Sequence, residues 1–338
     1  MTLPVVICDD SVLARNLLAR SLPTNWDIKI TFASNGQEAL DAIRQGKGDL
    51  LFLDLNMPVM DGYQTLEAIR REDLASLVLV VSGDIQPEAR KRVMALGALD
   101  FINKPINQKL VADILQSYGI ISICECSDPK KPAYFETKQP IDLVDIAQEV
   151  VNIAMGQAGK LLGELLGTFI YLPVPRVHLQ PYQDLPNLIA LRPNMTYSGV
   201  SQGFIGSGIA GEALVIISSD NLPILTSLLS TNQENLAAKE SSQASELEVL
   251  TSLASLLAGA CLKGIAEQLD VQFSLGHPAL LGQDTKLHKI LGKNQQQKVL
   301  AINLDYQLVE KGIQCDLLLV FTEDSLPALT ERMRCLND

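Results

Sequence analysis

Five polar residues in the first 104 positions each come directly after a short apolar run. Asp9 and Asp10 follow the first run, Asp54 the third, Ser82 the fourth and Lys104 the fifth. Three carboxylates held together repel one another, and a hard divalent cation such as Mg²⁺ relieves that repulsion. Beside such a metal, Asp54 can act as the nucleophile towards a phosphoryl donor, while Lys104 and the Ser82 hydroxyl can bind the phosphoryl oxygens.

The elements that must position these residues are five β-rich runs alternating with five amphipathic stretches. The runs are 5–8, 28–32, 50–53, 77–81 and 101–102, and the helical stretches are 11–22, 35–46, 62–72, 86–96 and 107–118. Five such units in succession predict a doubly wound, five-stranded parallel sheet with helices on both faces. Ligands of these folds lie beyond the carboxyl ends of the strands. Any one of the five polar residues could be a strand cap or a surface charge, but their shared position favours a site.

Four motifs give these residues a family likeness. They are Cys-Asp-Asp at 8–10, Leu-Asp-Leu-Asn-Met-Pro-Val-Met-Asp-Gly at 53–62, Val-Ser-Gly at 81–83 and Asn-Lys-Pro at 103–105. With them, residues 3–120 resemble the CheY-like receiver domain of response regulators. The resemblance implies that Asp54 is phosphorylated by a sensor histidine kinase. It also implies that Mg²⁺ is held by Asp10 and Asp54 with Asp9 assisting, and by the backbone carbonyl of Asn56.

The same resemblance implies how such a receiver responds to phosphorylation. Ser82 and Phe101 become a switch pair, in which the hydroxyl moves to the phosphoryl group and the aromatic ring swings inward. Lys104-Pro105 becomes a cis peptide, which fixes the approach of the lysine.

The remaining chain predicts a linker and a second, duplicated domain. We expect a receiver at 1–120, a linker at 121–140 and an α+β domain at 141–338. Within that last domain, the motif at 220–226 recurs at 324–330, which indicates an internal duplication. A helix at 142–166 has its counterpart at 245–269. This repeat predicts a pseudo-two-fold arrangement.

One glycine-rich stretch, at 206–211, matches the Gly-x-Gly-x-x-Gly pattern of dinucleotide binding. That pattern should follow a strand and open a helix, whereas this one leads into a strand-like run. We therefore interpret it as a hairpin.

The helix predicted at 142–166 carries an unusual stripe. At 100° per residue, one face holds Asp145, Glu149, Asn152, Gly156, Gly159 and Gly163. Each glycine costs a helix roughly 1 kcal/mol relative to alanine, so three on one stripe predict the close approach of another backbone. The alternative is a solvated polar face.

With Pro175 following Asn152, the stripe resembles the signature of the CheC/CheX family of chemotaxis phosphatases, over roughly 140–338. The resemblance implies an aspartyl-phosphate phosphatase with Glu149 and Asn152 as its catalytic residues. Glu149 would engage the lysine of a phosphorylated CheY-like receiver, and Asn152 would orient the attacking water. Ser252 and Ser255 occupy the duplicate positions, which predicts one active face and one silent face.

Two alternatives to this hypothesis remain open. The second domain could be a binding module for a CheD-like protein or for the flagellar switch, with little phosphatase activity. Alternatively, the helix face could act on Asp54 of its own chain or of a dimer mate.

The composition excludes several other classes of protein. The chain has 338 residues, 47% of them hydrophobic, and a net charge of −12 without a basic half, which disfavours nucleic-acid binding. No apolar run approaches the roughly 20 residues of a membrane helix, and no signal peptide is evident, so we expect a cytoplasmic protein without membrane insertion. The three histidines are widely spaced, which argues against a histidine-based hydrolase.

Overall fold

The computed structural model describes residues 2–24, 26–121, 142–189, 195–233, 246–287 and 296–336. Its contacts divide the chain into two units, Met1–Glu149 and Val150–Leu336. The linker predicted at 121–140 lies outside the described residues from position 122 onward.

The first unit contains five parallel strands in the order β2-β1-β3-β4-β5, and the prediction of five successive strand–helix units is confirmed. The elements are β1 Leu3–Cys8, α1 Val12–Ser21, β2 Ile28–Ala33, α2 Gly36–Arg44, β3 Leu50–Leu53, α3 Gly62–Arg71, β4 Leu77–Ser82, α4 Pro87–Ala95, β5 Asp100–Asn103 and α5 Gln108–Ser117. Side chains alternate across each strand, so Val5 and Ile7 join the core beneath α1 and α5, whereas Val6 and Cys8 join the core beneath α2 and α3.

The first unit also contains the beginning of the next helix, α6, which spans Leu143–Leu166. Residues up to Glu149 cluster with the parallel sheet, and those from Val150 onward cluster with the second unit. One helix therefore supplies residues to both units.

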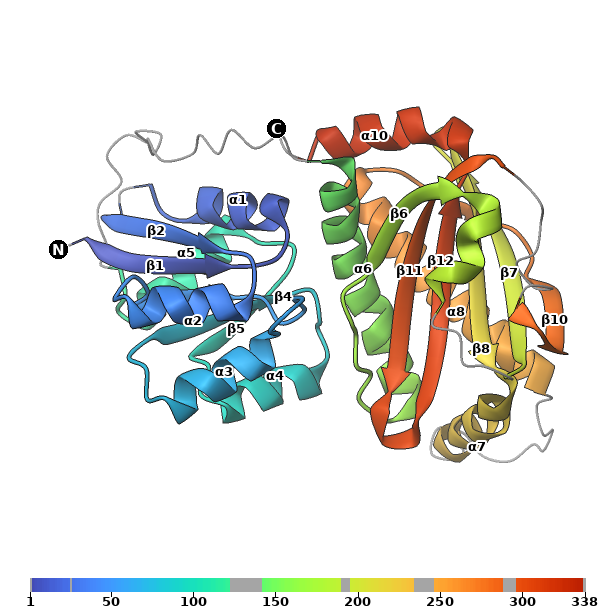
Figure 1. Ribbon diagram of the computed structural model, residues 1–338, viewed down its shortest axis with the longest axis horizontal. Coiled ribbons are helices and arrows are strands. Elements are labelled where there is room, and N and C mark those ends of the chain that lie inside the picture. Colours follow the sequence, from blue (N-terminus) through green and yellow to red (C-terminus); the bar gives the residue numbers. More distant parts are fainter. Residues whose placement is uncertain are drawn as a thin grey trace. The chain divides into compact units, whose positions relative to one another are not determined.

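The second unit is built on an antiparallel sheet. After α6 come β6 Arg176–Pro181, η1 Tyr182–Leu188, β7 Tyr197–Gly206, β8 Ile209–Ser218, η2 Ser219–Asn221, α7 Leu222–Gln233, α8 Glu246–Leu269, β9 Ser274–Leu275, β10 Ala279–Thr285, β11 Lys298–Leu308, η3 Val309–Lys311, β12 Ile313–Phe321, η4 Glu323–Ser325 and α10 Leu326–Arg334. Its strand order is β10-β7-β8-β12-β11-β6, with β9 paired to β7 (Figure 1).

The glycine-rich stretch at 206–211 forms a hairpin, as predicted. It joins β7 to β8, with Gly206 paired to Ile209. Ser207 and Gly208 both have positive φ, 54° and 77°, which is the backbone required at the two central positions of a type I′ turn. The dinucleotide pattern in the sequence is thus a consequence of turn geometry.

The helices α6 and α8 are each 24 residues long and begin 103 positions apart, and each half ends in a helix after a short 3₁₀ turn. The antiparallel sheet confirms an α+β domain, whereas its pseudo-two-fold symmetry stays a prediction. Gly159 has a local packing role: a Cβ there would lie 2.9 Å from both δ carbons of Leu172. The close approach at Gly159 is thus made by a side chain of the same unit and not by another backbone.

One helix differs from the expectation that no apolar run is long enough for a membrane helix. By length and composition, α8 could cross a membrane, with a mean hydropathy of 1.7 over its most apolar window. More than half of that window is buried inside the structure, where α8 packs on β7 and β8. Such burial is typical of the core helix of a globular domain.

Two glycines on α8 give a matched test of this packing. A Cβ on Gly264 would lie 2.9 Å from Ala154 Cα of α6, whereas a Cβ on Gly259 would meet Leu275 at an ordinary 3.7 Å. Gly259→Ala should therefore stabilise the second unit by up to roughly 1 kcal/mol through helix propensity. Gly264→Ala should destabilise it by about 1–3 kcal/mol because the helices must separate. Urea unfolding followed by far-UV circular dichroism measures both, and a Gly264→Ala protein as stable as Gly259→Ala would contradict this packing.

Candidate phosphorylation site

The parallel sheet brings three aspartates of distant sequence position together. Cys8 pairs with Leu53 across β1 and β3, so the residues that follow, Asp9 and Asp54, leave the sheet side by side. Carboxylate oxygens of Asp9, Asp10 and Asp54 all lie within 4.8 Å of one another. The sequence prediction that these carboxylates meet is confirmed.

Lys104 lies at the centre of the site, because β5 ends beside β4 and directs this side chain towards the acids. Its Nζ lies 2.7 Å from Asp9 Oδ2, 3.5 Å from Asp54 Oδ1 and 3.1 Å from Glu149 Oε1. The Lys104 side chain is only 1% exposed. A single buried ammonium group therefore faces three carboxylates.

Burial and mutual repulsion shift the ionisation of these groups. Burial, reinforced by Asp9 and opposed by Lys104, raises the pKa of Asp10 to about 7. Burial likewise raises the pKa of Asp54 to about 8 and that of Glu149 to about 7. Burial alone would lower the pKa of Lys104, but Asp54, Asp9 and Glu149 outweigh it and raise that pKa well above its ordinary value. The site holds more carboxylates than one lysine can neutralise.

The other residues expected at the site surround Asp54. The amide of Asn56 donates to Asp54 Oδ2 at 3.0 Å, and Asp54 Oδ1 accepts no hydrogen bond within the described part of the chain. Ser82 is fully buried at the end of β4, where its hydroxyl accepts from the amide of Asp84 at 3.2 Å. Phe101 is buried on the neighbouring strand, and the Lys104–Pro105 peptide is cis, as expected.

The donor set fits a hard divalent cation. Three carboxylates in mutual reach, one of them with an oxygen lacking a hydrogen-bond donor, match the oxygen ligands that Mg²⁺ prefers. Asp9, Asp10, Asp54 and the carbonyl of Asn56 would be the residues that hold it. When bound, the metal would neutralise charge on a phosphoryl group.

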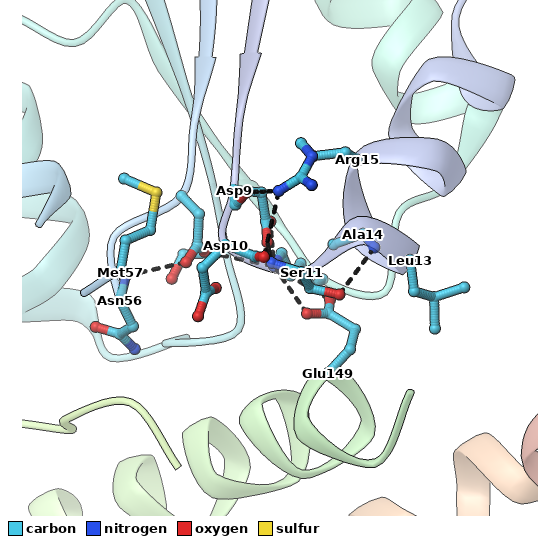
Figure 2. A network of polar contacts seen from close by, with 12 residues as sticks. Asp9, Asp10, Ser11, Leu13, Ala14, Arg15, Asn56, Met57 and Glu149 are labelled. Carbon is cyan, nitrogen blue, oxygen red and sulfur yellow. Dashed lines mark hydrogen bonds and ion pairs between the residues drawn. The ribbon is translucent and has the colours of Figure 1, made fainter. Parts of the chain in front are cut away.

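Three residues at the beginning of α6 contact this site. Glu149 projects from its helix towards Asp9 and Asp10 (Figure 2), and its carboxylate pairs with Lys104. Gln148 Nε2 donates to Asp10 Oδ2 at 3.0 Å. Asp145 accepts from the amides of Val12 and Leu13, both at 3.0 Å. These amides open α1, and a helix N-terminus favours an anion. We name Asp145, Gln148 and Glu149 the acidic segment.

Sequence reasoning missed part of this network. Gln148 was not selected, because a glutamine beside an acidic stripe carries no chemical signal of its own. Arg15 was also missed, although its guanidinium binds the carbonyl oxygens of Asp9 and Asp10. The stripe placed Asp145 and Glu149 on one helix face, but it could not show that the groups donating hydrogen bonds to them belong to the same chain.

Comparisons with known proteins agree on the first unit. Residues 5–116 match the family described as response regulator receiver domain. The chain is 34% identical to a protein-glutamate methylesterase/protein-glutamine glutaminase of Bacillus licheniformis over 40% of this chain and 42% of that protein. It is 41% identical to a protein of the same name from Methanospirillum hungatei, over 46% and 45%. The chain thus spans less than half the length of these relatives.

One solved structure is similar to a part of the chain. The response regulator domain of Thermotoga maritima CheB is 26% identical, covers 35% of this chain and all of that one, and has a TM-score of 0.31. Together with the parallel sheet, the family match identifies the N-terminal part of this chain as a CheY-like response regulator receiver domain fused to a C-terminal part.

The predicted activity is corrected by these relatives. They are named as methylesterases and glutaminases, not as CheC/CheX phosphatases, which contradicts the assignment of an aspartyl-phosphate phosphatase. The structure adds a physical reason: Glu149 is paired with Lys104 of its own chain. Asn152, one turn later, is buried, and its Oδ1 has no hydrogen bond in the described structure. Neither residue keeps a catalytic assignment.

Neutralising Asp54 should stabilise the protein in metal-free buffer. Because the folded state raises the pKa of Asp54 from 3.8 to about 8, ionisation of Asp54 favours the unfolded state increasingly as the pH rises through this range. Asp54→Asn should therefore increase the free energy of unfolding by roughly 1–3 kcal/mol at pH 8, and by less at pH 5. Urea unfolding followed by the fluorescence of Trp26 measures it. The exposed Asp49→Asn is the control, and an equal effect of both substitutions at pH 8 would refute the crowded-carboxylate description.

Proposed function

We propose that this chain is a chemotaxis response regulator in which phosphorylation of Asp54 releases the acidic segment of α6 from Lys104. The observation that carries the proposal is the position of the Lys104 ammonium, 3.5 Å from Asp54 and 3.1 Å from Glu149. The group that would bind a phosphoryl oxygen is already engaged by the helix that leads into the C-terminal part.

Charge decides which partner Lys104 keeps. A phosphoryl group brings about −1.5 to −2 charges and three strong acceptor oxygens. Covalently attached to Asp54, it would face the Glu149 carboxylate across the same ammonium group. Like-charge repulsion and competition for Lys104 both favour departure of Glu149. Glu149 therefore serves as an occupant of the phosphoryl site in the resting protein.

The other contacts of the acidic segment make this exchange cooperative. Asp145 binds the first amides of α1, and Gln148 binds Asp10. Mg²⁺ held by Asp10 would remove the acceptor of Gln148. Metal and phosphoryl group would thus weaken neighbouring contacts of one short helical segment, whose helix continues into the second unit.

The proposal includes the partners and the cofactor expected from the sequence. A receiver domain takes its phosphoryl group from a phosphodonor such as a sensor histidine kinase, and Asp54 is the acceptor we propose, with Mg²⁺ as cofactor. Ser82 and Phe101 are the proposed switch pair. We propose a cytoplasmic location, and a CheD-like partner has no support from the relatives.

Amide hydrogen exchange tests the release directly. Beryllium fluoride with Mg²⁺ mimics the phosphoaspartate, and its binding should increase the exchange rates of the Val12 and Leu13 amides at least tenfold, because Asp145 no longer protects them. Asp54→Asn should block the increase. Glu149→Ala should raise these rates without beryllium fluoride.

The matched control is Glu164→Ala, an exposed carboxylate further along α6 whose partner is Lys160. It should leave the Val12 and Leu13 rates unchanged. Rates that stay the same in the wild type after beryllium fluoride has bound would reject the release of the acidic segment.

The names of the relatives favour a second candidate, a hydrolase of glutamate methyl esters or glutamine side chains in the C-terminal part. Such chemistry needs an activated nucleophile. The chain spans less than half the length of the relatives that carry this name, whereas the receiver family matches residues 5–116, so the receiver function comes first. Methanol release from a methyl-esterified receptor, dependent on Asp54 phosphorylation, would establish the hydrolase, and its absence with active relatives as positive control would exclude it.

A further inference from the structure

The second unit holds a small polar cavity lined by residues from the end of β8 and the beginning of β12, two neighbouring inner strands of the sheet. Its volume is about 20 Å³, which is the space of one water molecule or one ion. The polar lining consists of Ser218, Asn221, Gln314 and Asp316, with Tyr197 at its wall.

The strand register places the polar groups on one sheet face. Tyr197 pairs with Ser218, and Ile216 pairs with Asp316. Because Ile216 and Ser218 are two residues apart on β8, Ser218 and Asp316 lie on the same face of the sheet. Asp316 is 5% exposed. Its Oδ1 accepts from Asn303 Nδ2 at 3.2 Å, and its Oδ2 accepts from Gln314 Nε2 at 3.4 Å.

A buried hydroxyl points independently to an occupant. Ser218 is 7% exposed, and its Oγ has no hydrogen-bond partner in the described structure. A buried polar group without a partner costs about 1–3 kcal/mol, so it is rarely left unsatisfied. A ligand in the cavity would satisfy it.

The charges around the cavity identify the kind of ligand. Asp305 on β11 lies directly opposite Asp316 on β12, and like charges in such a pair destabilise a sheet. The neighbouring Asn303 is 1% exposed, and its Oδ1 also lacks a partner. Arg176 lies opposite Asn303 on β6, at the exposed edge strand, and compensates the pair in part. The surplus charge beside the cavity is negative, and the unpartnered atom of its lining, among the described residues, is the Ser218 oxygen.

We infer that this cavity binds one hard divalent cation, with the Asp316 carboxylate and the Ser218 hydroxyl as ligands and the side-chain oxygens of Gln314 and Asn221 completing the set. Oxygen donors of this kind, carboxylate, amide and hydroxyl, are the ligands that Ca²⁺ and Mg²⁺ accept. The site lies in the second unit and is independent of the aspartates at the phosphorylation site.

The cation would hold a structural position. It would join Ser218, the last residue of β8, to Asp316, which lies near the beginning of β12, beside Gly312. Binding to the folded state alone would raise the stability of the second unit in proportion to the logarithm of the cation concentration.

Calorimetric titration of the full-length chain with Ca²⁺, and separately with Mg²⁺, tests the inference. Asp54→Asn provides the background, because it removes one carboxylate from the phosphorylation site. In that background the expected result is one saturable site, weakened about tenfold by Ser218→Ala and roughly a hundredfold by Asp316→Asn. Ser252→Ala, an exposed serine of α8, is the control and should bind as the background does.

Ser218→Ala keeps the test decisive even if Asp316→Asn fails to fold. A purely structural role predicts that removing an unpartnered hydroxyl is neutral or stabilising and leaves cation binding unchanged. The inference is overturned if no saturable binding of either cation is found, or if binding persists in Ser218→Ala at the affinity of the background. In that case the cavity holds water.

Discussion

The ion pairs of Lys104 are the interaction on which the rest of the account depends. One fully buried ammonium group faces Asp9, Asp54 and Glu149, and the last of these belongs to a helix that is not part of the receiver sheet. Removing the lysine from such a cluster would leave uncompensated carboxylates in the interior, whereas removing one carboxylate relieves their mutual repulsion. The site is therefore sensitive to any group that adds or removes charge near Lys104, and a phosphoryl group on Asp54 is the one that this chemistry allows.

The parallel sheet and the acidic segment contribute different parts of this arrangement. The strand register fixes where Asp9, Asp54 and Lys104 leave the sheet, and this framework is rigid because both sheet faces are buried. The acidic segment is held by a few polar contacts at the beginning of α6. Stable packing on one side and exchangeable polar contacts on the other are what a switch requires.

Much of the first unit could be predicted from sequence, because each apolar run of β type is followed by an amphipathic stretch and each strand end by a polar residue. All five strands and the meeting of the three aspartates followed from that pattern. The second unit was harder to predict from sequence. Helix α8 is apolar on most sides because it is a core helix, and Gly159 is small because Leu172 packs on it. Neither reason can be seen without the partners in space.

The error about activity has a similar origin. A stripe of Asp145, Glu149 and Asn152 has the same appearance whether it faces another protein or its own chain, since spacing on a helix defines a face but not its neighbour. In the structure Glu149 faces Lys104. The cation site proposed around Asp316 and Ser218 was also invisible to sequence, because residues from separate strands meet there only through the antiparallel register.

The coupling free energy between Lys104 and Glu149 tests the central claim most directly. A double-mutant cycle with Lys104→Met and Glu149→Gln, evaluated from urea unfolding, gives this energy in the resting protein and again with Mg²⁺ and beryllium fluoride bound. The account predicts a favourable coupling of about 1–3 kcal/mol in the resting protein and a value near zero with the phosphoryl mimic bound. A coupling near zero in the resting protein, or one unchanged by the mimic, would contradict it.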